Sequence, residues 1–167
     1  MTAFPMPTVA ILNGHAFAGG CMFALSHDYR IMNSKRGFVC MNEVELGFPL
    51  PPGMNAVCQW ILLYLPLNLF SRQKLSPQTC RDLILTAKKY GGPAALTVGL
   101  VDAIADPEDL FEKGVKMAQD LVPFGNDRKN FKCLKEEMYK TILDACFNKG
   151  LAVGIKAEGG PAITPKL

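Results

Sequence analysis

The chain has 167 residues and a mass of 18.2 kDa; about half of its residues are hydrophobic and a fifth are charged. This length fits one domain. The composition excludes a disordered chain, which could not bury enough apolar surface to offset the entropy of ordering. Six cysteines are too few for a small disulfide scaffold. With 18 basic against 15 acidic residues the net charge is only +3, so nucleic acid is not an expected partner.

Charged residues are unevenly distributed along the chain. Residues 1–27 carry no charged side chain, and only Glu43 and Glu45 are charged between residues 37 and 71. Residues 107–167, in contrast, hold 10 of the basic and 9 of the acidic residues. We therefore expect a buried core in the first two-thirds, and surface helices with a tail in the last third. Because the chain starts within its own core, we also expect further protein upstream of Met1.

The uncharged N-terminal segment has the features of neither a signal peptide nor a membrane span. A signal peptide begins with basic residues, and the first basic residue here is Arg30. A spanning helix needs about 20 mostly apolar residues, whereas prolines and glycines interrupt residues 1–27, and the apolar run 60–70 is short and contains Pro66. The cysteines form no CxxC pair, so we expect no metal site and a reducing, intracellular compartment.

Short strands and one helix are predicted at the start of the chain. Residues 8–12 are apolar and β-branched between turn-forming residues, which is typical of a buried strand. Gly19 and Gly20 then open a short buried helix that runs to residue 26. Residues 28–32 and 37–41 predict two more strands, and a loop rich in proline and glycine follows over 46–53.

Helices dominate the rest of the chain. Ser76 followed by Pro77 is an N-cap signal that predicts a helix over 77–87. The other predicted elements are helices over 54–70 (interrupted at Pro66), 93–98 and 106–122, and a strand over 100–105. One apolar stripe predicts a long amphipathic helix, with its members at i, i+3, i+7, i+11 and i+14: Phe131, Leu134, Met138, Ile142 and Ala145. The order of elements is that of an α/β protein with a helical C-terminal part.

Two glycines join the first strand to the first helix. The spacing from Gly14 to Gly19 matches a phosphate loop, but the Lys and Ser or Thr that such a loop needs are replaced by Gly20 and Cys21. Free N–H groups at a helix start can stabilise developing negative charge, so an oxyanion-binding corner is one interpretation. The other, which we weight more heavily from spacing alone, is a tight packing contact that requires small residues.

Glu43 and Glu45 are candidate acid/base residues, because they stand in the apolar segment 39–48. Desolvation would raise the pKa of such a carboxyl and suit it to proton transfer. If the segment is helical, residues two apart diverge by about 200°, so at most one points inward. Two solvent-exposed carboxylates are an equally good interpretation. For His27, beside Asp28, we favour a structural role.

Three segments, in order and spacing, resemble the crotonase (enoyl-CoA hydratase/isomerase) superfamily. Residues 5–29, PMPTVAILNGHAFAGGCMFALSHDY, resemble its second oxyanion-hole segment. Residues 37–47, GFVCMNEVELG, are similar to its catalytic-glutamate segment, and Ala94-Ala95 with VGLVDAI at 98–104 are similar to a stretch late in its core. The resemblance implies a ββα spiral core over 1–105, incomplete at its N-terminus, then C-terminal helices over 106–149 and a flexible tail over 150–167.

The resemblance also implies roles for individual residues. Gly19 would donate a backbone N–H to a thioester oxyanion, and Glu43 would be the acid/base carboxylate. The hydratases of the superfamily have a second glutamate at the place of Met22, which disfavours hydration here. The residues implied in substrate binding, with the last three lining the acyl pocket, are Ala18, Gly20, Leu46, Phe48, Leu50 and Pro51.

The segment around Asn42-Glu43 and Leu46-Gly47 resembles the Δ3,Δ2-enoyl-CoA isomerases most closely. The implied reaction is isomerisation of 3-enoyl-CoA to trans-2-enoyl-CoA in fatty-acid β-oxidation, in the chain itself or in a longer enzyme of which it is part. The alternatives are a non-catalytic short form that binds acyl-CoA or mediates oligomerisation, and a related enoyl-CoA hydratase. The resemblance also implies upstream strands that supply a second oxyanion donor, and we expect these strands before Met1.

Partners and compartment are expectations from the same resemblance. The partner would be an acyl-CoA thioester, with no separate cofactor because coenzyme A is part of the substrate, and the assembly a homotrimer or hexamer. Pro165-Lys166-Leu167 resembles a variant of the Ser-Lys-Leu peroxisomal signal, which predicts the peroxisome, with the cytosol or mitochondrion as alternatives.

Overall fold

The computed structural model describes residues 1–63 and 76–147. The predicted helix interruption at Pro66, the tail over 150–167 and the C-terminal tripeptide lie outside these ranges. Within them, no helix has both the length and the hydropathy needed to cross a membrane.

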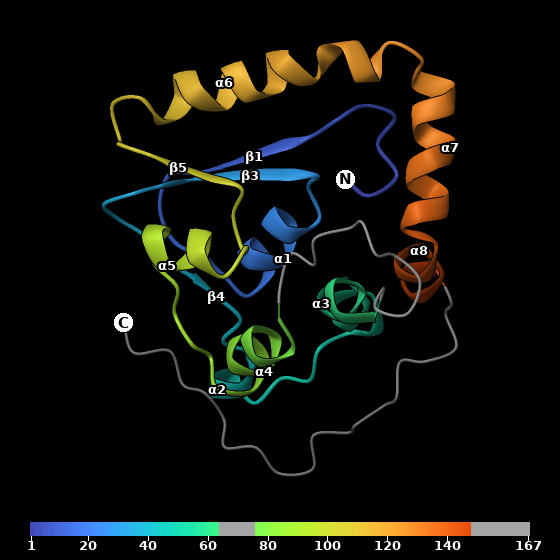
Figure 1. The fold of residues 1–167 in the computed structure, drawn as a ribbon. Helices are drawn as coiled ribbons and strands as arrows, with labels where there is room; N and C mark the ends of the chain where they lie inside the picture. The colour runs from blue at the N-terminus through green and yellow to red at the C-terminus, as the bar shows by residue number, and fades with distance from the viewer. Residues whose placement is uncertain (64–75, 148–167) are drawn as a thin grey trace, which may run out of the picture.

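The centre of the fold is a parallel sheet of three strands (Figure 1). The strands β1 (Val9–Leu12), β3 (Tyr29–Asn33) and β5 (Ala103–Ala105) stand in the order β1-β3-β5, with Ile31 beside both Ile11 and Ala103. These strands confirm the apolar segments predicted from the sequence, because strands of a parallel sheet are covered on both faces.

A second, smaller parallel sheet contains β2 (Ala16–Phe17) and β4 (Val39–Cys40). The β4 strand confirms the prediction over 37–41, whereas β2 has only two residues and was not predicted from the sequence. An isolated antiparallel bridge joins Val39 to Tyr90. This small sheet brings the end of β2 next to the end of β4, and the two candidate catalytic segments follow these strands.

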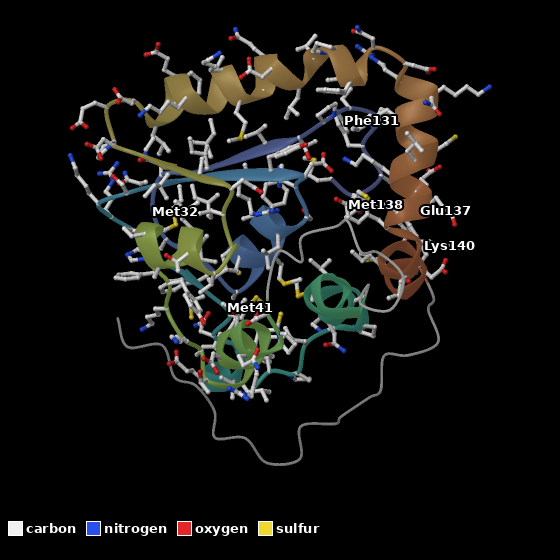
Figure 2. The ribbon with its side chains drawn as sticks, viewed as in Figure 1. Met32, Met41, Phe131, Glu137, Met138 and Lys140 are labelled. Atoms are coloured by element: carbon white, nitrogen blue, oxygen red, sulfur yellow. The ribbon has the colours of Figure 1, made fainter. Side chains whose placement is uncertain are left out.

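Helices cover the two faces of the larger sheet, as Figure 1 shows. The helix α6 (Leu110–Leu121) packs on β1 and β3, where Ile31 and Leu110 are buried together. On the other face, α1 (Gly19–Leu25) and α5 (Gly92–Thr97) cover a larger core that contains Met32 and Met41 (Figure 2). The side chains of neighbouring residues on a strand point to opposite faces, so Ile31 and Met32 belong to different clusters.

Three further helices connect the small sheet to the rest of the core. The segment after β4 forms α2 (Glu43–Leu46), and α3 (Pro52–Leu63) begins within the stretch predicted as a loop. The helix α4 (Pro77–Leu85) has the predicted N-cap, since the Ser76 Oγ accepts a hydrogen bond from the Thr79 N–H at 3.1 Å. The thiols of Cys21 and Cys40 are free and buried, and burial raises the pKa of the Cys40 thiol.

The prediction of one long C-terminal helix was wrong. After a 3₁₀ turn, η1 (Val122–Gly125), the chain forms α7 (Arg128–Met138) and α8 (Lys140–Phe147) with a break at Tyr139. The α7 part of the apolar stripe is not a buried face, because Leu134 and Met138 are 61% and 43% exposed, whereas Ile142 on α8 is buried. Instead Lys135 and Tyr139 are buried, and α8 leaves the direction of α7 to pack on α3 (Figures 1 and 2).

Candidate functional site

The turn from β2 into α1 leaves backbone N–H groups available to a ligand. The N–H of Ala18 donates to the Cys40 carbonyl at 3.0 Å, and the Ala18 carbonyl accepts the N–H of Met22 at 3.0 Å. Gly19 and Gly20 follow as the first residues of α1, where N–H groups have no partner inside the helix. Both glycines are exposed, and their N–H groups have no hydrogen-bond partner within residues 1–63 and 76–147.

The interpretation of this turn as a packing contact was wrong. A Cβ atom added to Gly19 or Gly20 would meet no other heavy atom of the described chain within 4 Å. By contrast, a Cβ on Gly92, the first residue of α5, would lie 2.6 Å from the Asn33 carbonyl oxygen. Within the described residues, packing therefore explains Gly92 but does not explain the glycine pair of α1.

Ala18 holds a strained backbone conformation at this turn. Its φ of 47° and ψ of −120° lie in a region that glycine adopts readily and other residues avoid. Such a conformation costs on the order of 1–3 kcal/mol. Strain of this kind concentrates at functional sites, and here it lies directly before the unpaired N–H groups of α1.

Glu43 lies at the start of α2, directly after the strand that pairs with β2. Its Oε2 atom is buried and has no hydrogen-bond partner in the described chain, and the same is true of the Oδ1 atom of Asn42. Glu45 is exposed, so the helical geometry separates the two carboxylates as expected. Because buried polar atoms are nearly always paired in folded proteins, these two unpaired oxygens mark a polar site that the described chain leaves unsatisfied.

An apolar pocket of about 540 Å³ opens beside Gly19. Three helices contribute its walls: α1 with Met22 and Phe23, the start of α3, and α8. Of the residues predicted in substrate binding, only Pro51 lines this pocket. The remaining lining residues are Pro52, Gly53, Met54, Val57, Ala145 and Cys146.

The other predicted substrate residues lie elsewhere. Gly20 lines a separate groove along β1, and Ala18 is half-buried at the turn itself and lines neither this groove nor the apolar pocket. Leu50 packs against the main core, whereas Leu46 and Phe48 are 49% and 63% exposed and line none of these cavities. Glu43 is likewise absent from the pocket lining.

The pocket residues on α8 could not be found from local sequence. Ala145 was predicted as part of an apolar stripe, and Cys146 carried no signal. They reach the pocket because α8 turns at Tyr139 and packs against α3, and that turn depends on contacts between residues more than 100 positions apart.

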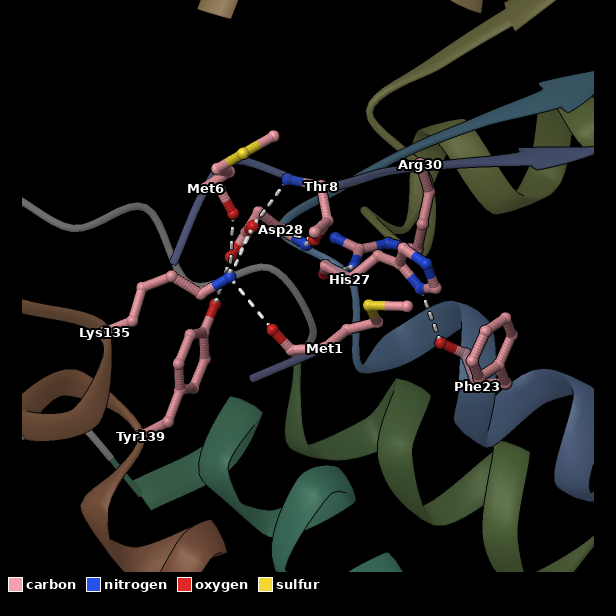
Figure 3. A network of polar contacts seen from close by, with 9 residues as sticks. All are labelled: Met1, Met6, Thr8, Phe23, His27, Asp28, Arg30, Lys135 and Tyr139. Atoms are coloured by element: carbon pink, nitrogen blue, oxygen red, sulfur yellow. Dashed lines mark hydrogen bonds and ion pairs between the residues drawn. The ribbon is translucent and has the colours of Figure 1, made fainter. Parts of the chain in front are cut away.

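A polar network lies beyond the C-terminal end of α1 (Figure 3). Asp28 accepts hydrogen bonds from the N–H and hydroxyl of Thr8, both at 2.8 Å, and pairs with the Lys135 ammonium at 2.8 Å. Arg30 donates to the carbonyls of Leu100 and His27 and forms an ion pair with Asp102. Apart from Thr8, these residues line a cavity of about 430 Å³, but their hydrogen-bonding groups are already paired with protein atoms.

The titratable groups of this network are shifted by their surroundings. Burial lowers the pKa of His27, whose Nδ1–H donates to the Phe23 carbonyl oxygen at 2.8 Å and offsets part of that shift. Burial, together with the neighbouring Asp28, raises the pKa of Tyr139 well above its ordinary value. Tyr139 is therefore a hydrogen-bond donor to Asp28, and His27 has the structural role that its sequence context suggested.

Comparison with known proteins identifies the family. A sequence model described as "Enoyl-CoA hydratase/isomerase" matches residues 1–153. The chain belongs to this family. Two relatives from Arabidopsis thaliana are "Enoyl-CoA delta isomerase 1, peroxisomal", which is 32% identical over 145 residues, and "Enoyl-CoA delta isomerase 3", which is 35% identical over 140 residues. They match 86% and 83% of the chain, which spans only 55% and 54% of their own lengths.

Solved structures agree on the fold. A probable enoyl-CoA hydratase from Mycobacterium tuberculosis superposes with a TM-score of 0.70 at 22% identity, over 86% of the chain and 54% of that structure. A methylmalonyl-CoA decarboxylase superposes with a TM-score of 0.68 at 20% identity, over 85% of the chain and 48% of that structure. These likenesses confirm the α/β crotonase fold that the sequence resemblance implied.

Proposed function

We propose that the chain carries the catalytic segments of an enoyl-CoA isomerase, which converts 3-enoyl-CoA to trans-2-enoyl-CoA. The observation that carries this proposal is the combination of free N–H groups at Gly19 with the unpaired buried oxygen of Glu43, on the elements that follow the paired strands β2 and β4. The isomerase relatives from Arabidopsis thaliana support this reaction over others of the family.

Glu43 acts as the single acid/base group of the reaction. Its carboxylate removes a proton from C2 of the 3-enoyl thioester, the double bond moves to C2–C3, and the same carboxyl returns the proton to C4. One group suffices because the reaction moves a single proton from C2 to C4, with no net gain or loss of protons. The buried Oε2 atom, which has no hydrogen-bond partner in the described chain, supports this role because it is available to take up a substrate proton.

The N–H of Gly19 stabilises the oxygen of the dienolate intermediate. Negative charge develops on the thioester oxygen when the C2 proton leaves, and a preoriented N–H donor lowers the energy of that charge. The strained turn at Ala18 holds the donor in place before substrate binds. The apolar pocket beside Gly19 takes the acyl chain of the substrate.

Met22 supports isomerisation over hydration. Hydration requires a positioned water molecule and a second carboxylate, whereas Met22 is buried and lines the pocket with an apolar side chain. We further propose a peroxisomal location and a homo-oligomeric state for the protein. The relative named "Enoyl-CoA delta isomerase 1, peroxisomal" supports the location.

Turnover of 3-hexenoyl-CoA by the purified chain tests the proposed reaction, because the conjugated product has a new ultraviolet absorbance. We expect Glu43→Gln to lower turnover by about 10²–10⁴-fold, the usual contribution of a general base. Glu45→Gln is the matched control, since it removes an exposed carboxylate two residues away. Equal activity of the two variants would contradict the role of Glu43. A wild-type chain that binds acyl-CoA without turnover would indicate the non-catalytic short form.

A further inference from the structure

We propose that Asp28, Lys135 and Tyr139 form a positioning network that fixes α8 as a wall of the apolar pocket and thereby sets the acyl-chain length that the pocket accepts. This inference rests on the proposed function, because it assumes that the pocket beside Gly19 holds the acyl chain. The three residues do not contact the acyl chain. They affect its binding only through the position of α8.

Lys135 is the centre of the network (Figure 3). It stands on α7, its side chain is 3% exposed, and its ammonium lies 2.8 Å from Asp28 Oδ2. The same ammonium donates to the carbonyl oxygens of Met1 at 3.0 Å and Met6 at 3.5 Å. A buried charge is costly unless it is paired and hydrogen-bonded, so these contacts hold α7 at one place against the N-terminal segment and the start of β3.

Tyr139 transfers this constraint from α7 to α8. Its N–H donates to the Lys135 carbonyl at 2.8 Å, and its carbonyl accepts the N–H groups of Ile142 and Leu143 at 2.9 and 3.0 Å. Its hydroxyl donates to Asp28 Oδ1 at 3.3 Å. The break between the two helices is therefore joined to α7 and α8 through its backbone and to Asp28 through its side chain, which fixes the direction in which α8 leaves.

The far end of α8 forms part of the pocket. Ile142, one turn after the break, is buried in the main core, and Ala145 and Cys146 line the pocket. The fit against α3 is close, because a Cβ added to Gly53 would lie 2.5 Å from Cys146 Sγ. A small rotation of α8 about Tyr139 would therefore move the wall of the pocket directly.

The exposed ion pair on α7 provides a contrast. Lys132 pairs with Glu136 at 3.6 Å, and the two side chains are 51% and 44% exposed. Exposed pairs of this kind contribute little to stability. Removing the Lys132 charge should leave α7 and α8 in place, whereas removing the Lys135 charge should release them.

Binding of saturated acyl-CoA thioesters tests the proposal, with butanoyl-, octanoyl-, dodecanoyl- and hexadecanoyl-CoA titrated calorimetrically into the chain. We expect Tyr139→Phe and Lys135→Met to change the ratio of the dodecanoyl to the butanoyl dissociation constant by about tenfold, the discrimination that a methylene or more provides in an apolar pocket. Cys146→Ala, which alters the wall without touching the network, should also change this ratio. Lys132→Met should leave it unchanged.

The outcomes separate this proposal from the proposed function. A wild-type chain that binds none of the thioesters contradicts the proposed function, and this inference fails with it. A wild-type chain that binds them, with a ratio that Tyr139→Phe and Lys135→Met leave unchanged, contradicts the positioning role alone. Tyr139→Phe removes one hydroxyl and keeps the fold testable if Lys135→Met does not fold, with circular dichroism as the check on folding. Faster hydrogen exchange of α8 amides in Tyr139→Phe would support the proposal, and unchanged exchange would contradict it.

Discussion

The two ends of α1 differ in how their polar groups are satisfied. At the N-terminal end, the N–H groups of Gly19 and Gly20 have no partner in the described chain, Ala18 is strained, and Glu43 at the start of α2 has a buried oxygen that also lacks a partner there. Beyond the C-terminal end, the Asp28 network pairs its buried charges with protein atoms. Polar groups without a protein partner indicate where a ligand binds, whereas polar groups that are paired with protein atoms hold the fold together.

The largest effect on stability should come from the Asp28 network beyond the C-terminal end of α1. Asp28→Ala would leave the Lys135 ammonium buried without its carboxylate and would remove the acceptor of two bonds from Thr8. We expect the free energy of unfolding to fall by about 3–5 kcal/mol, as when one partner of a buried ion pair is removed. Urea denaturation measures this loss.

Asp120→Ala is the control for that measurement, because Asp120 belongs to an exposed pair with Lys116. It should change stability by less than about 1 kcal/mol. If Asp28→Ala were no more destabilising than Asp120→Ala, the network would not hold the fold together.

Two glycines that each begin a helix test the contrast more sharply. Gly92→Ala would place a Cβ 2.6 Å from the Asn33 backbone oxygen, which cannot move aside easily, and should cost about 1–3 kcal/mol of stability. Gly19→Ala meets no atom of the described chain and should change stability by less than about 0.5 kcal/mol. It should nevertheless weaken turnover of 3-enoyl-CoA, because the methyl group stands where the thioester approaches. Thermal unfolding and turnover of both variants measure these effects. A destabilised Gly19→Ala variant would restore the packing interpretation.

The sequence predicted what depends on local pattern. The apolar strand β1, the Ser76 cap and the separation of Glu43 from Glu45 follow from residue type and spacing, and each is present. The glycine pair was ambiguous, because spacing cannot distinguish a glycine required by packing from one that leaves room for a ligand. Only the neighbours of the missing Cβ distinguish them, and those neighbours are distant in sequence.

The C-terminal region was predicted less well for the same reason. An apolar stripe that continued from α7 into α8 indicated one helix, but it contained no information about Asp28, more than 100 residues earlier. The buried Lys135 and Tyr139 read as polar surface residues in their local sequence, and only their contacts with Asp28 explain their burial. The pocket wall on α8 was missed as a consequence.

Ala18→Gly, at the N-terminal end of α1, should have an intermediate effect on stability. Glycine adopts a φ of 47° with a ψ of −120° without the steric cost of a Cβ atom, so the variant should be about 1 kcal/mol more stable. The gain is smaller than the strain released, because glycine also has a more disordered unfolded state. Chemical denaturation measures the change. A less stable variant would show that the turn is not strained.

The smallest effect concerns His27, beyond the C-terminal end of α1, and the pH dependence of stability. Burial lowers the pKa of His27 in the folded chain, so the His27 imidazole binds a proton more readily in the unfolded chain. The resulting stability is present above the unfolded pKa of about 6.5 and is lost as the pH falls from there through the lowered folded pKa. His27→Gln removes this proton uptake, and we expect its stability to fall less steeply than that of the wild type between about pH 6.5 and pH 5. Urea midpoints measured across this range test the difference. A steeper fall in the variant would show that His27 gains a proton on folding, and would contradict its neutral, hydrogen-bonded state in the network.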